Sequence, residues 1–204
     1  MFTQRAIREW EPRPVPDDLL VRIVEAATRA PSGSNLQPWR FVVVRDDSMR
    51  AAIASAVRAR YESNARLKTM VETLSKADDK TQRLMLLGAQ RLFTRLDRAP
   101  VLIIPCIYQI ASPTNEPNSL LAGSSIYPAV QNLLLAARAL GLGAVMTTIH
   151  SQVEPDLRRI LGLPDEATPA ALIPLGYPLG NFGPTTRKPV EEVLYWDGWA
   201  PRAS

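Results

Sequence analysis

The most informative part of this sequence reads APSGSNLQPWRF and covers residues 30–41. An apolar pattern at helical spacing precedes it, and Pro31 ends that helix because proline lacks an amide donor and clashes with the preceding turn. The polar residues that follow form a tight loop, and the chain from Trp39 onward reads as a strand over residues 39–45. Such a loop can hydrogen-bond a flat polar heterocycle or a ribityl chain. Ser, Asn and Gly also favour turns for local reasons, so a helix-to-strand turn without a ligand is the alternative.

Length and charge restrict the classes of protein to consider. The 204 residues suffice for one domain with a full core, so we expect a single domain over residues 1–204. The net charge is +4, and the 24 Lys and Arg are interspersed with 20 Asp and Glu. No block of like charge and no basic stripe with interleaved aromatics is present, so nucleic acid is not an expected partner.

The sequence offers no sign of export or membrane insertion. Its first residues lack an apolar run of signal-peptide length, and no stretch approaches the roughly 20 apolar residues that span a bilayer. The lone cysteine, Cys106, has no partner for an internal disulfide. We therefore expect a soluble cytoplasmic protein without a membrane partner.

The first half of the chain predicts one strand among several helices. Asp17 or Asp18 after Pro16 can cap a helix whose apolar face ends at Ala27, and Asp47 can cap the next helix. The helix after Asp47 is expected over roughly residues 48–60, and two more helices are expected around 62–76 and 80–97. Residues 61–98 are charged and mixed, so this helical excursion either covers a site as a lid or forms a solvated pair with no role.

The second half predicts three strands, two helices and a long tail. The apolar run at 101–108 reads as a strand in which Pro105 indicates an edge position or a bulge. A helix capped by Ser124 or Ser125 is apolar nearly all round and must be buried. This helix is expected over residues 126–140 and is ended by Gly141 and Gly143. The remaining expected elements are a loop at 111–119, a strand at 144–149, a helix from Pro155 to Gly162, a strand at 169–177 and a Pro- and Gly-rich tail to Trp199. This order favours an α+β sandwich with one mixed, largely antiparallel sheet between helical layers.

The chain carries few groups that could do chemistry alone. His150 is its only histidine, which excludes two-histidine zinc motifs, and Cys106 lies inside an apolar strand pattern. The segment 141–146 begins like a dinucleotide fingerprint but lacks the third glycine and opens a strand instead of a helix. No Gly-x-Ser-x-Gly elbow and no phosphate loop are present. A bound cofactor that carries the reaction fits this composition, and no metal site is expected.

Four segments, in order, resemble the nitroreductase family of FMN-dependent oxidoreductases. The first is QRAIREW at residues 4–10, similar to the family's N-terminal basic motif, and the second is the polar loop with the strand after it. The third is GLGAVMTT at residues 141–148, similar to the segment beside the flavin. The fourth comprises GYP at residues 176–178 and RKPVEEV at residues 187–193. The resemblance covers the chain from about residue 3 to residue 199.

The resemblance implies a homodimer with FMN at the interface and a C-terminal tail that wraps onto the partner subunit. It implies that arginines from both chain ends hold the flavin phosphate, because guanidinium groups bind phosphate bidentately. Thr148 is the candidate hydrogen-bond donor to flavin N5. Ala6 stands where relatives often carry serine, so only its backbone amide is expected to contribute. The implied cofactor-binding residues are Arg5, Ala6, Arg8, Pro31, Ser32, Gly33, Ser34, Asn35, Thr147, Thr148 and Arg187, with the loop at 31–35 acting on the flavin of the opposite subunit.

The activity implied by the resemblance is hydride transfer from NADH or NADPH to flavin N5 and then to an acceptor such as a nitroaromatic or a quinone. The nicotinamide and the acceptor occupy the same flavin face in turn, which is a ping-pong scheme. Two alternatives stay open. One is a flavin-binding storage or sensor protein with little turnover, and the other is a dehalogenase or flavin-fragmenting branch of the same fold.

Overall fold

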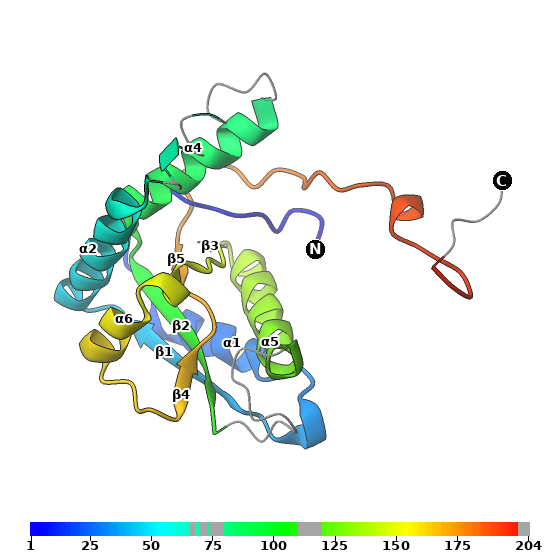
Figure 1. The fold of residues 1–204 in the computed structure, drawn as a ribbon, viewed down its shortest axis with the longest axis horizontal. Helices are drawn as coiled ribbons and strands as arrows, with labels where there is room; N and C mark the ends of the chain where they lie inside the picture. The colour runs from blue at the N-terminus through cyan, green and yellow to red at the C-terminus, as the bar shows by residue number, and fades with distance from the viewer. Residues whose placement is uncertain (66–67, 70–72, 74–79, 110–119, 200–204) are drawn as a thin grey trace.

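The computed structural model describes residues 1–65, 68–69, 73, 80–109 and 120–199 (Figure 1). A five-stranded sheet runs through the centre with strand order β1-β2-β5-β3, and β4 pairs with β2 beside β5. Every pair of neighbouring strands within the described residues is antiparallel, whereas the sequence predicts a mixed, largely antiparallel sheet. The strands are β1 (Trp39–Val44), β2 (Val101–Tyr108), β3 (Gly143–Ala144), β4 (Ala167–Pro169) and β5 (Ile173–Gly176). The helices are α1 (Asp17–Ala27), α2 (Asp47–Ser63), α4 (Lys80–Thr94), α5 (Leu120–Ala139) and α6 (Glu154–Leu161).

Helices cover both faces of the sheet, with α1 and α5 on one side and α2 and α6 on the other (Figure 1). The central strand β2 shows why. Ile103 faces the cluster of α1 and α5, while its neighbours Leu102 and Ile104 face the cluster of α2 and α6. A strand that is buried on both faces reads as a continuous apolar run, which is the pattern seen at residues 101–108. The predicted α+β sandwich is confirmed.

Pro105 lies in the central strand of this sheet, so the edge position predicted for it is wrong and the bulge is right. The β2 strand pairs with β5 at Ile103 and with β4 at Cys106. Two β2 residues therefore lie opposite three residues, 170–172, of the other segment. The Pro105 carbonyl accepts a hydrogen bond of 2.8 Å from the Ala170 amide, so the side that lacks a donor faces the bulge.

The bulge also divides the predicted strand at 169–177 into β4 and β5. The predicted strand at 144–149 is likewise shorter, because pairing with β5 ends at Ala144. After it, Thr147 forms an isolated bridge with Leu172, and a 3₁₀ turn follows over Ile149–Gln152. The local backbone thus changes from strand to turn at the two threonines.

Two helix starts differ from the sequence prediction by one residue. Asp46, not Asp47, caps α2, because its side chain accepts a hydrogen bond of 2.9 Å from the Met49 amide. The Asp47 side chain is 92% exposed and pairs with an arginine on its own helix. Pro16 occupies the cap position of α1 without a side-chain bond, and the Asp17 carboxylate pairs with an arginine instead.

The buried helix α5 begins earlier than predicted, at Leu120, so Ser124 and Ser125 lie within it and cap nothing. Pro128 lies inside the helix, where it removes one helical donor. Burial of the helix is confirmed, since Ile126 and Leu133 are fully buried. The helix from Pro155 to Gly162 is also confirmed as α6.

The charged middle region is helical where the structure describes it. The predicted helices at 48–60 and 80–97 correspond to α2 and to α4 with a 3₁₀ turn over Leu96–Arg98. The predicted helix at 62–76 lies mostly outside the described residues, and the predicted loop at 111–119 lies entirely outside them.

After β5 the chain runs away from the body of the molecule as an extended tail (Figure 1). Up to residue 199, where the described part of the tail stops, its one regular element is a 3₁₀ turn over Val190–Glu192. The rings of Tyr195 and Trp199 stack with centroids 4.7 Å apart, and Trp199 is 84% exposed. Other exposed apolar tail residues are Leu179, Val190, Val193, Leu194 and Trp196. Among all described residues, no helix is both long enough and apolar enough to cross a bilayer.

Candidate functional site

The N-terminal segment is held tightly between the sheet and the start of the tail. The Ile7 amide donates to the Ala144 carbonyl at 3.2 Å, and the segment continues by pairing with residues 177–179. A Cβ atom at Gly143 would lie 2.6 Å from the Ile7 side chain, so only glycine permits this approach. The backbone on either side of Ile7 is thereby fixed, and with it the positions of Arg5 and Arg8.

Arg5 and Arg8 line a pocket of about 280 Å³ between this segment, α4 and the tail. Arg91 of α4 also lines it and lies 3.8 Å from the carboxylate of Glu9, which offsets that one positive charge. Two guanidinium groups therefore stay without an acid in the pocket. Its full lining is Arg5, Ala6, Ile7, Arg8, Glu9, Gly88, Arg91, Gly180 and Asn181.

Arg8 is the most unusual charge of this pocket. It is half-buried, and its side chain has no hydrogen-bond or ion-pair partner in the part of the chain that the structure describes. Burial and the neighbouring Arg5 charge both lower the pKa of Arg8. A half-buried guanidinium without an acid is costly unless an anion binds it, and a phosphate matches its paired donors.

Gly88 makes room for Arg8 on α4. A Cβ atom at Gly88 would lie 3.3 Å from Cδ of Arg8, inside ordinary contact distance. A glycine inside a helix costs about 1 kcal/mol relative to alanine, so its presence indicates a packing or functional reason. The sequence analysis missed Gly88, Arg91 and Asn181. The interior glycine of α4 was the signal that could have found this wall of the pocket.

The first part of the tail runs beside the N-terminal segment before it leaves the body of the molecule, and it carries Arg187. The Thr185 amide and hydroxyl both lie within hydrogen-bond distance of the Phe2 carbonyl, at 3.1 and 3.3 Å. A guanidinium nitrogen of Arg5 lies 2.9 Å from where a Cβ of Gly183 would be. Arg187 follows two residues after Thr185, is exposed, and donates to the Thr186 carbonyl at 2.7 Å. The structure thus brings Arg5 and Arg8 into one pocket, with the segment that carries Arg187 alongside.

The loop at 31–35 is a strained turn that presents polar groups to solvent. Ser34, Asn35 and Gln37 all adopt positive φ, at 50°, 55° and 48°. The Ser32 hydroxyl accepts from the Gln37 amide at 3.0 Å, and the side chains of Ser34 and Asn35 are exposed. Non-glycine residues in this region cost about 1–3 kcal/mol each and cluster at functional sites. Pro31 and Gly33 complete this loop.

The loop and the arginine pocket lie near opposite ends of α5. The Gly33 amide donates to Oγ of Ser125 at 3.3 Å, and Nε of Arg138 donates to Oγ1 of Thr3 at 3.1 Å. These two α5 residues are 13 positions apart, which corresponds to about 20 Å along a helix axis. One chain therefore does not bring its own loop to its own arginine pocket.

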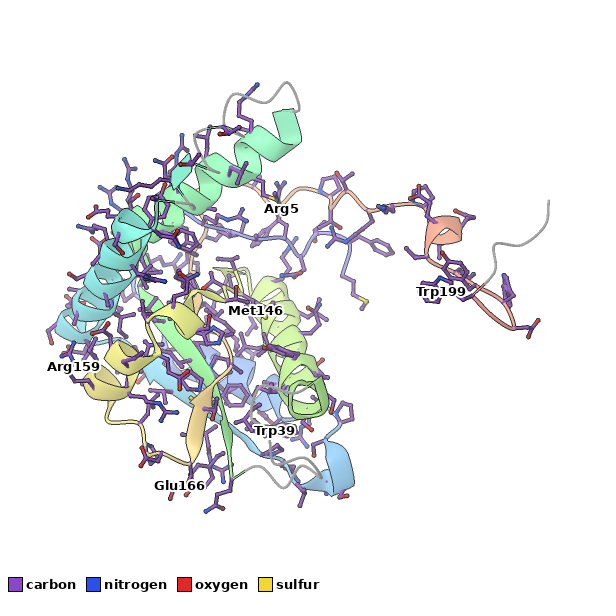
Figure 2. All side chains as sticks on the ribbon, viewed as in Figure 1. Arg5, Trp39, Met146, Arg159, Glu166 and Trp199 are labelled. Carbon is purple, nitrogen blue, oxygen red and sulfur yellow. The ribbon has the colours of Figure 1, made fainter. Side chains whose placement is uncertain are left out.

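Side chains drawn on the ribbon make the same separation visible. Figure 2 shows Arg5 well apart from Trp39, which follows the loop, with Met146 labelled between them in this view. The residue after Met146 begins the pair of threonines that the sequence singles out.

Of the two threonines, only Thr148 keeps free donors. The amide and hydroxyl of Thr147 both donate to the Leu172 carbonyl, at 3.0 and 2.9 Å. Thr148 is exposed, and its amide and hydroxyl have no hydrogen-bond partner among the described residues. Its carbonyl accepts from Ser151. Thr147 therefore anchors the segment, and Thr148 is the residue of the pair that can donate to a ligand.

Neither His150 nor Cys106 is placed as a reactive group. Nδ1 of His150 lies 3.4 Å from the Thr147 carbonyl, and burial lowers the pKa of this imidazole. Burial raises the pKa of the Cys106 thiol to about 11, so it is not a thiolate at neutral pH. Among the described residues, no group of His, Cys, Asp and Glu could hold a metal ion.

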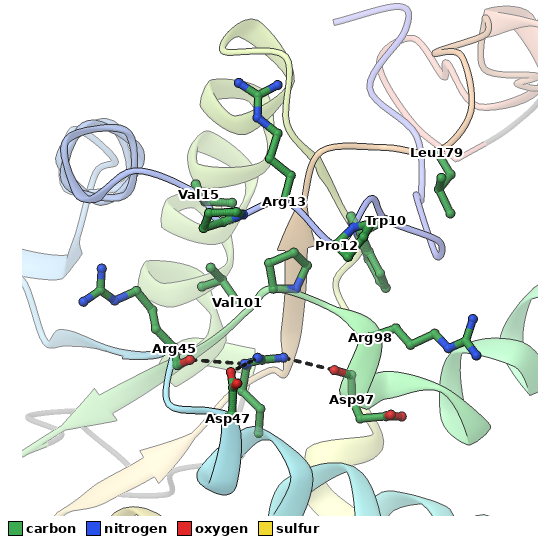
Figure 3. Close-up of a pocket in the computed structure, with 13 residues that line it drawn as sticks. Trp10, Pro12, Arg13, Val15, Arg45, Asp47, Asp97, Arg98, Val101 and Leu179 are labelled. Atoms are coloured by element: carbon green, nitrogen blue, oxygen red, sulfur yellow. Dashed lines mark hydrogen bonds and ion pairs between the residues drawn. The ribbon is translucent and has the colours of Figure 1, made fainter.

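A pocket of about 800 Å³ lies elsewhere, between residues 10–15 and the turns that flank β2 and α2 (Figure 3). It contains none of the residues expected at the site. Arg50 crosses it and donates to the carbonyls of Asp97 and Ala99 at 3.0 and 2.7 Å. These bonds hold the start of α2 against the start of β2, so we assign Arg50 a structural role.

Comparison with known proteins places this geometry in context. The model of the nitroreductase family matches residues 2–177. A protein named NADH dehydrogenase from Thermus thermophilus is 34% identical over 95% of this chain and 92% of its own. Iodotyrosine deiodinase 1 from Rattus norvegicus is 32% identical, with 94% of this chain and 66% of the relative covered.

Solved structures agree with the sequence relatives. The crystal structure of an FMN and NADPH-dependent nitroreductase from Sphigopyxis sp. strain HMH superposes with a TM-score of 0.72. The two chains are 25% identical, and the match covers 97% of this chain and 96% of that one.

Proposed function

Since this chain belongs to the nitroreductase family, we propose that it is an FMN-dependent oxidoreductase. It would take hydride from NADH or NADPH and pass two electrons to a small acceptor such as a nitroaromatic or a quinone. When bound, FMN would supply the hydride-accepting N5 and the electron exchange. The described residues contain no reactive thiolate, and their one histidine is buried, which supports a cofactor as the reacting group.

The observation that carries this proposal is the uncompensated charge of Arg8. Arg5 and Arg8 would hold the flavin phosphate from the N-terminal side, and Arg187 would approach it from the tail. Placing two guanidinium groups that repel each other in one pocket is energetically favourable only when a dianion binds between them. The backbone of Ala6, between the two arginines, lines the same pocket.

We propose a homodimer because the two halves of the site lie far apart on one chain. The loop at 31–35 would contact the ribityl chain and ring edge of the flavin held by the partner's arginines. The exposed apolar tail supports the same arrangement, since large apolar side chains such as Trp199 gain from burial on another subunit. The outer edge of β1 is unpaired among the described residues and offers backbone groups for such a tail.

Thr148 would donate to the flavin at N5. Its amide and hydroxyl have no partner in the part of the chain that the structure describes, and the neighbouring Thr147 fixes the segment through two bonds to Leu172. A hydrogen-bond donor at N5 would draw electron density from that atom and so would make it a better hydride acceptor.

We propose one domain over residues 1–204, with the excursion at 61–98 acting as a lid. Both helical layers share one sheet, which favours a single unit. From this excursion, α4 already contributes Gly88 and Arg91 to the wall of the arginine pocket.

Reductive dehalogenation is the second candidate activity. It is supported by the 32% identity to the rat iodotyrosine deiodinase over most of this chain. An FMN store or sensor with little turnover is the outcome to distinguish from both.

Anaerobic titration of the purified, FMN-loaded protein tests the proposal. NADH or NADPH should bleach the flavin band, and a quinone or nitroarene should restore it. Recovery with an iodotyrosine, but not with these acceptors, would favour the dehalogenase. A flavin that neither nicotinamide reduces would overturn the proposed NAD(P)H oxidoreductase.

A matched pair of variants tests the phosphate site. Arg187→Ala should weaken FMN binding, because a charged hydrogen bond contributes roughly 1.5–3 kcal/mol, or about ten- to hundredfold in Kd. Lys188→Ala, the adjacent cation, should leave the affinity nearly unchanged. Equal effects of the two substitutions would reject the assignment of Arg187, and a protein that binds no FMN would reject the function itself.

A further inference from the structure

Arg138, in the last turn of α5, contacts both the N-terminal segment and the first part of the tail. Its Nε donates to Oγ1 of Thr3 at 3.1 Å, and its guanidinium carbon lies 3.8 Å from the centroid of the Phe182 ring. Thr3 belongs to the N-terminal segment and Phe182 to the tail. One side chain from the most buried helix therefore sets where two otherwise extended segments meet.

The contacts around this junction lead directly to the arginine pocket. Thr3 precedes Arg5 by two residues, and Phe182 precedes Gly183, which lies against the Arg5 guanidinium. Beyond it, Thr185 is bonded twice to the Phe2 carbonyl. The course of the tail up to Arg187 thus depends on a short series of contacts that begins at Arg138.

The chemistry of Arg138 suits this role. A guanidinium is planar and always charged, so it can donate through Nε in its plane while its face stacks on an aromatic ring. Its place in the last turn of α5 adds a favourable interaction with the helix dipole. Arg138 is not among the residues that line the pocket.

We infer that Arg138 is a positioning residue for the cofactor site: it fixes the departure of the tail so that Arg187 faces the phosphate held by Arg5 and Arg8. The inference rests on the proposed function. It concerns a residue that the family resemblance and the sequence pattern did not single out.

The test is a double-mutant cycle in FMN affinity, measured by quenching of flavin fluorescence on the full-length apoprotein. Arg138→Met should weaken FMN binding about tenfold, in the range of one lost charged hydrogen bond. In an Arg187→Ala background the same change should add almost nothing, because the group that Arg138 positions is then absent. Arg159→Met, an exposed arginine of α6 far from this junction (Figure 2), is the matched control and should have no effect.

A second variant guards against misfolding. Phe182→Leu removes the ring from the tail and leaves Arg138 in place, so it should reproduce the loss of affinity and its dependence on Arg187. Unfolding midpoints of the apoproteins should stay close to that of the parent. If Arg138→Met does not fold, the Phe182 cycle decides alone.

Three results would overturn the inference. They are unchanged FMN affinity in both variants, losses that add fully to that of Arg187→Ala, and a loss of the same size in Arg159→Met. Failure of the parent protein to bind FMN would instead overturn the proposed function, and that result is seen before any variant is made.

Discussion

The indole N–H of Trp10 donates a hydrogen bond of 2.8 Å to the carbonyl oxygen of Gly143, although 133 positions separate the two residues. Both are buried, and the bond fixes the N-terminal segment against the end of β3. The missing Cβ of Gly143 is what allows the two backbones to approach. The packing of the N-terminal segment on the sheet and the position of the arginine pocket therefore both depend on the contact at Gly143.

Gly143→Ala should destabilise the protein, because the new methyl group would lie 2.6 Å from the Ile7 side chain. Overpacking of this kind costs about 1–3 kcal/mol. Urea denaturation of the apoprotein measures the change. Gly198→Ala is the control, since a Cβ there meets open space, and equal stability of the two variants would contradict the explanation.

Arg8→Met should separate stability from binding. The apoprotein should unfold at the same temperature or a higher one, because the substitution removes a half-buried charge that repels Arg5 and has no acid partner among the described residues. FMN affinity should fall. Thermal denaturation without flavin and titration with flavin measure the two effects, and Arg22→Met on the exposed face of α1 controls for loss of charge alone. A clear drop in apoprotein stability would show that Arg8 has a structural role instead.

Ser125→Ala should loosen the loop that follows α1. Ser125 is 7% exposed, and its hydroxyl accepts from the Gly33 amide at 3.3 Å. Losing this bond costs about 1 kcal/mol and should be felt locally as faster hydrogen exchange at Gly33. Ser55→Ala, on the exposed face of α2, should leave that exchange rate unchanged. Protection of Gly33 that survives in Ser125→Ala would mean that the strained turn holds itself.

Stability should fall as the pH drops below about 6.5, the ordinary pKa of histidine. Burial lowers the pKa of His150 in the folded state, so the unfolded chain takes up a proton at a pH where the folded chain does not. The destabilisation should grow until the pH reaches the lowered folded value. The single histidine makes this measurable as one imidazole resonance in proton NMR, whose midpoint should lie below 6.5. His150→Gln should remove this histidine component from the stability profile, and a midpoint above 6.5 would refute the assignment.

Much of the architecture follows from patterns that are local in the sequence. The apolar run at 101–108 predicts a strand buried on both faces, and the apolar helix before Gly141 predicts the buried α5. Errors arose where one residue competes with its neighbour for the same role. Asp46 and Asp47 are equally good caps in sequence, and only the backbone conformation decides that Asp46 is used.

Long-range contacts were the part that local patterns could not supply. Nothing near Pro105 tells that the facing segment carries an extra residue, because the bulge exists only in the pairing of distant strands. In the same way, Gly88 and Arg138 belong to the candidate site through contacts with the N-terminal segment. Gly88 lies against Arg8, and Arg138 is bonded to Thr3, each across 80 or more positions of sequence. Local motifs identified the arginines and the polar loop, whereas tertiary structure identified the residues that hold them.

The roughly helix-long gap between the polar loop and the arginine pocket has a genetic consequence. In the proposed dimer each active centre borrows its loop from one chain and its arginines from the other. Co-expressing an Arg8→Met chain with a chain damaged at Ser32 should give hybrid molecules with one centre that carries both lesions and one that carries neither. Two alleles that are each inactive alone should therefore restore about half of the activity per hybrid, which is interallelic complementation.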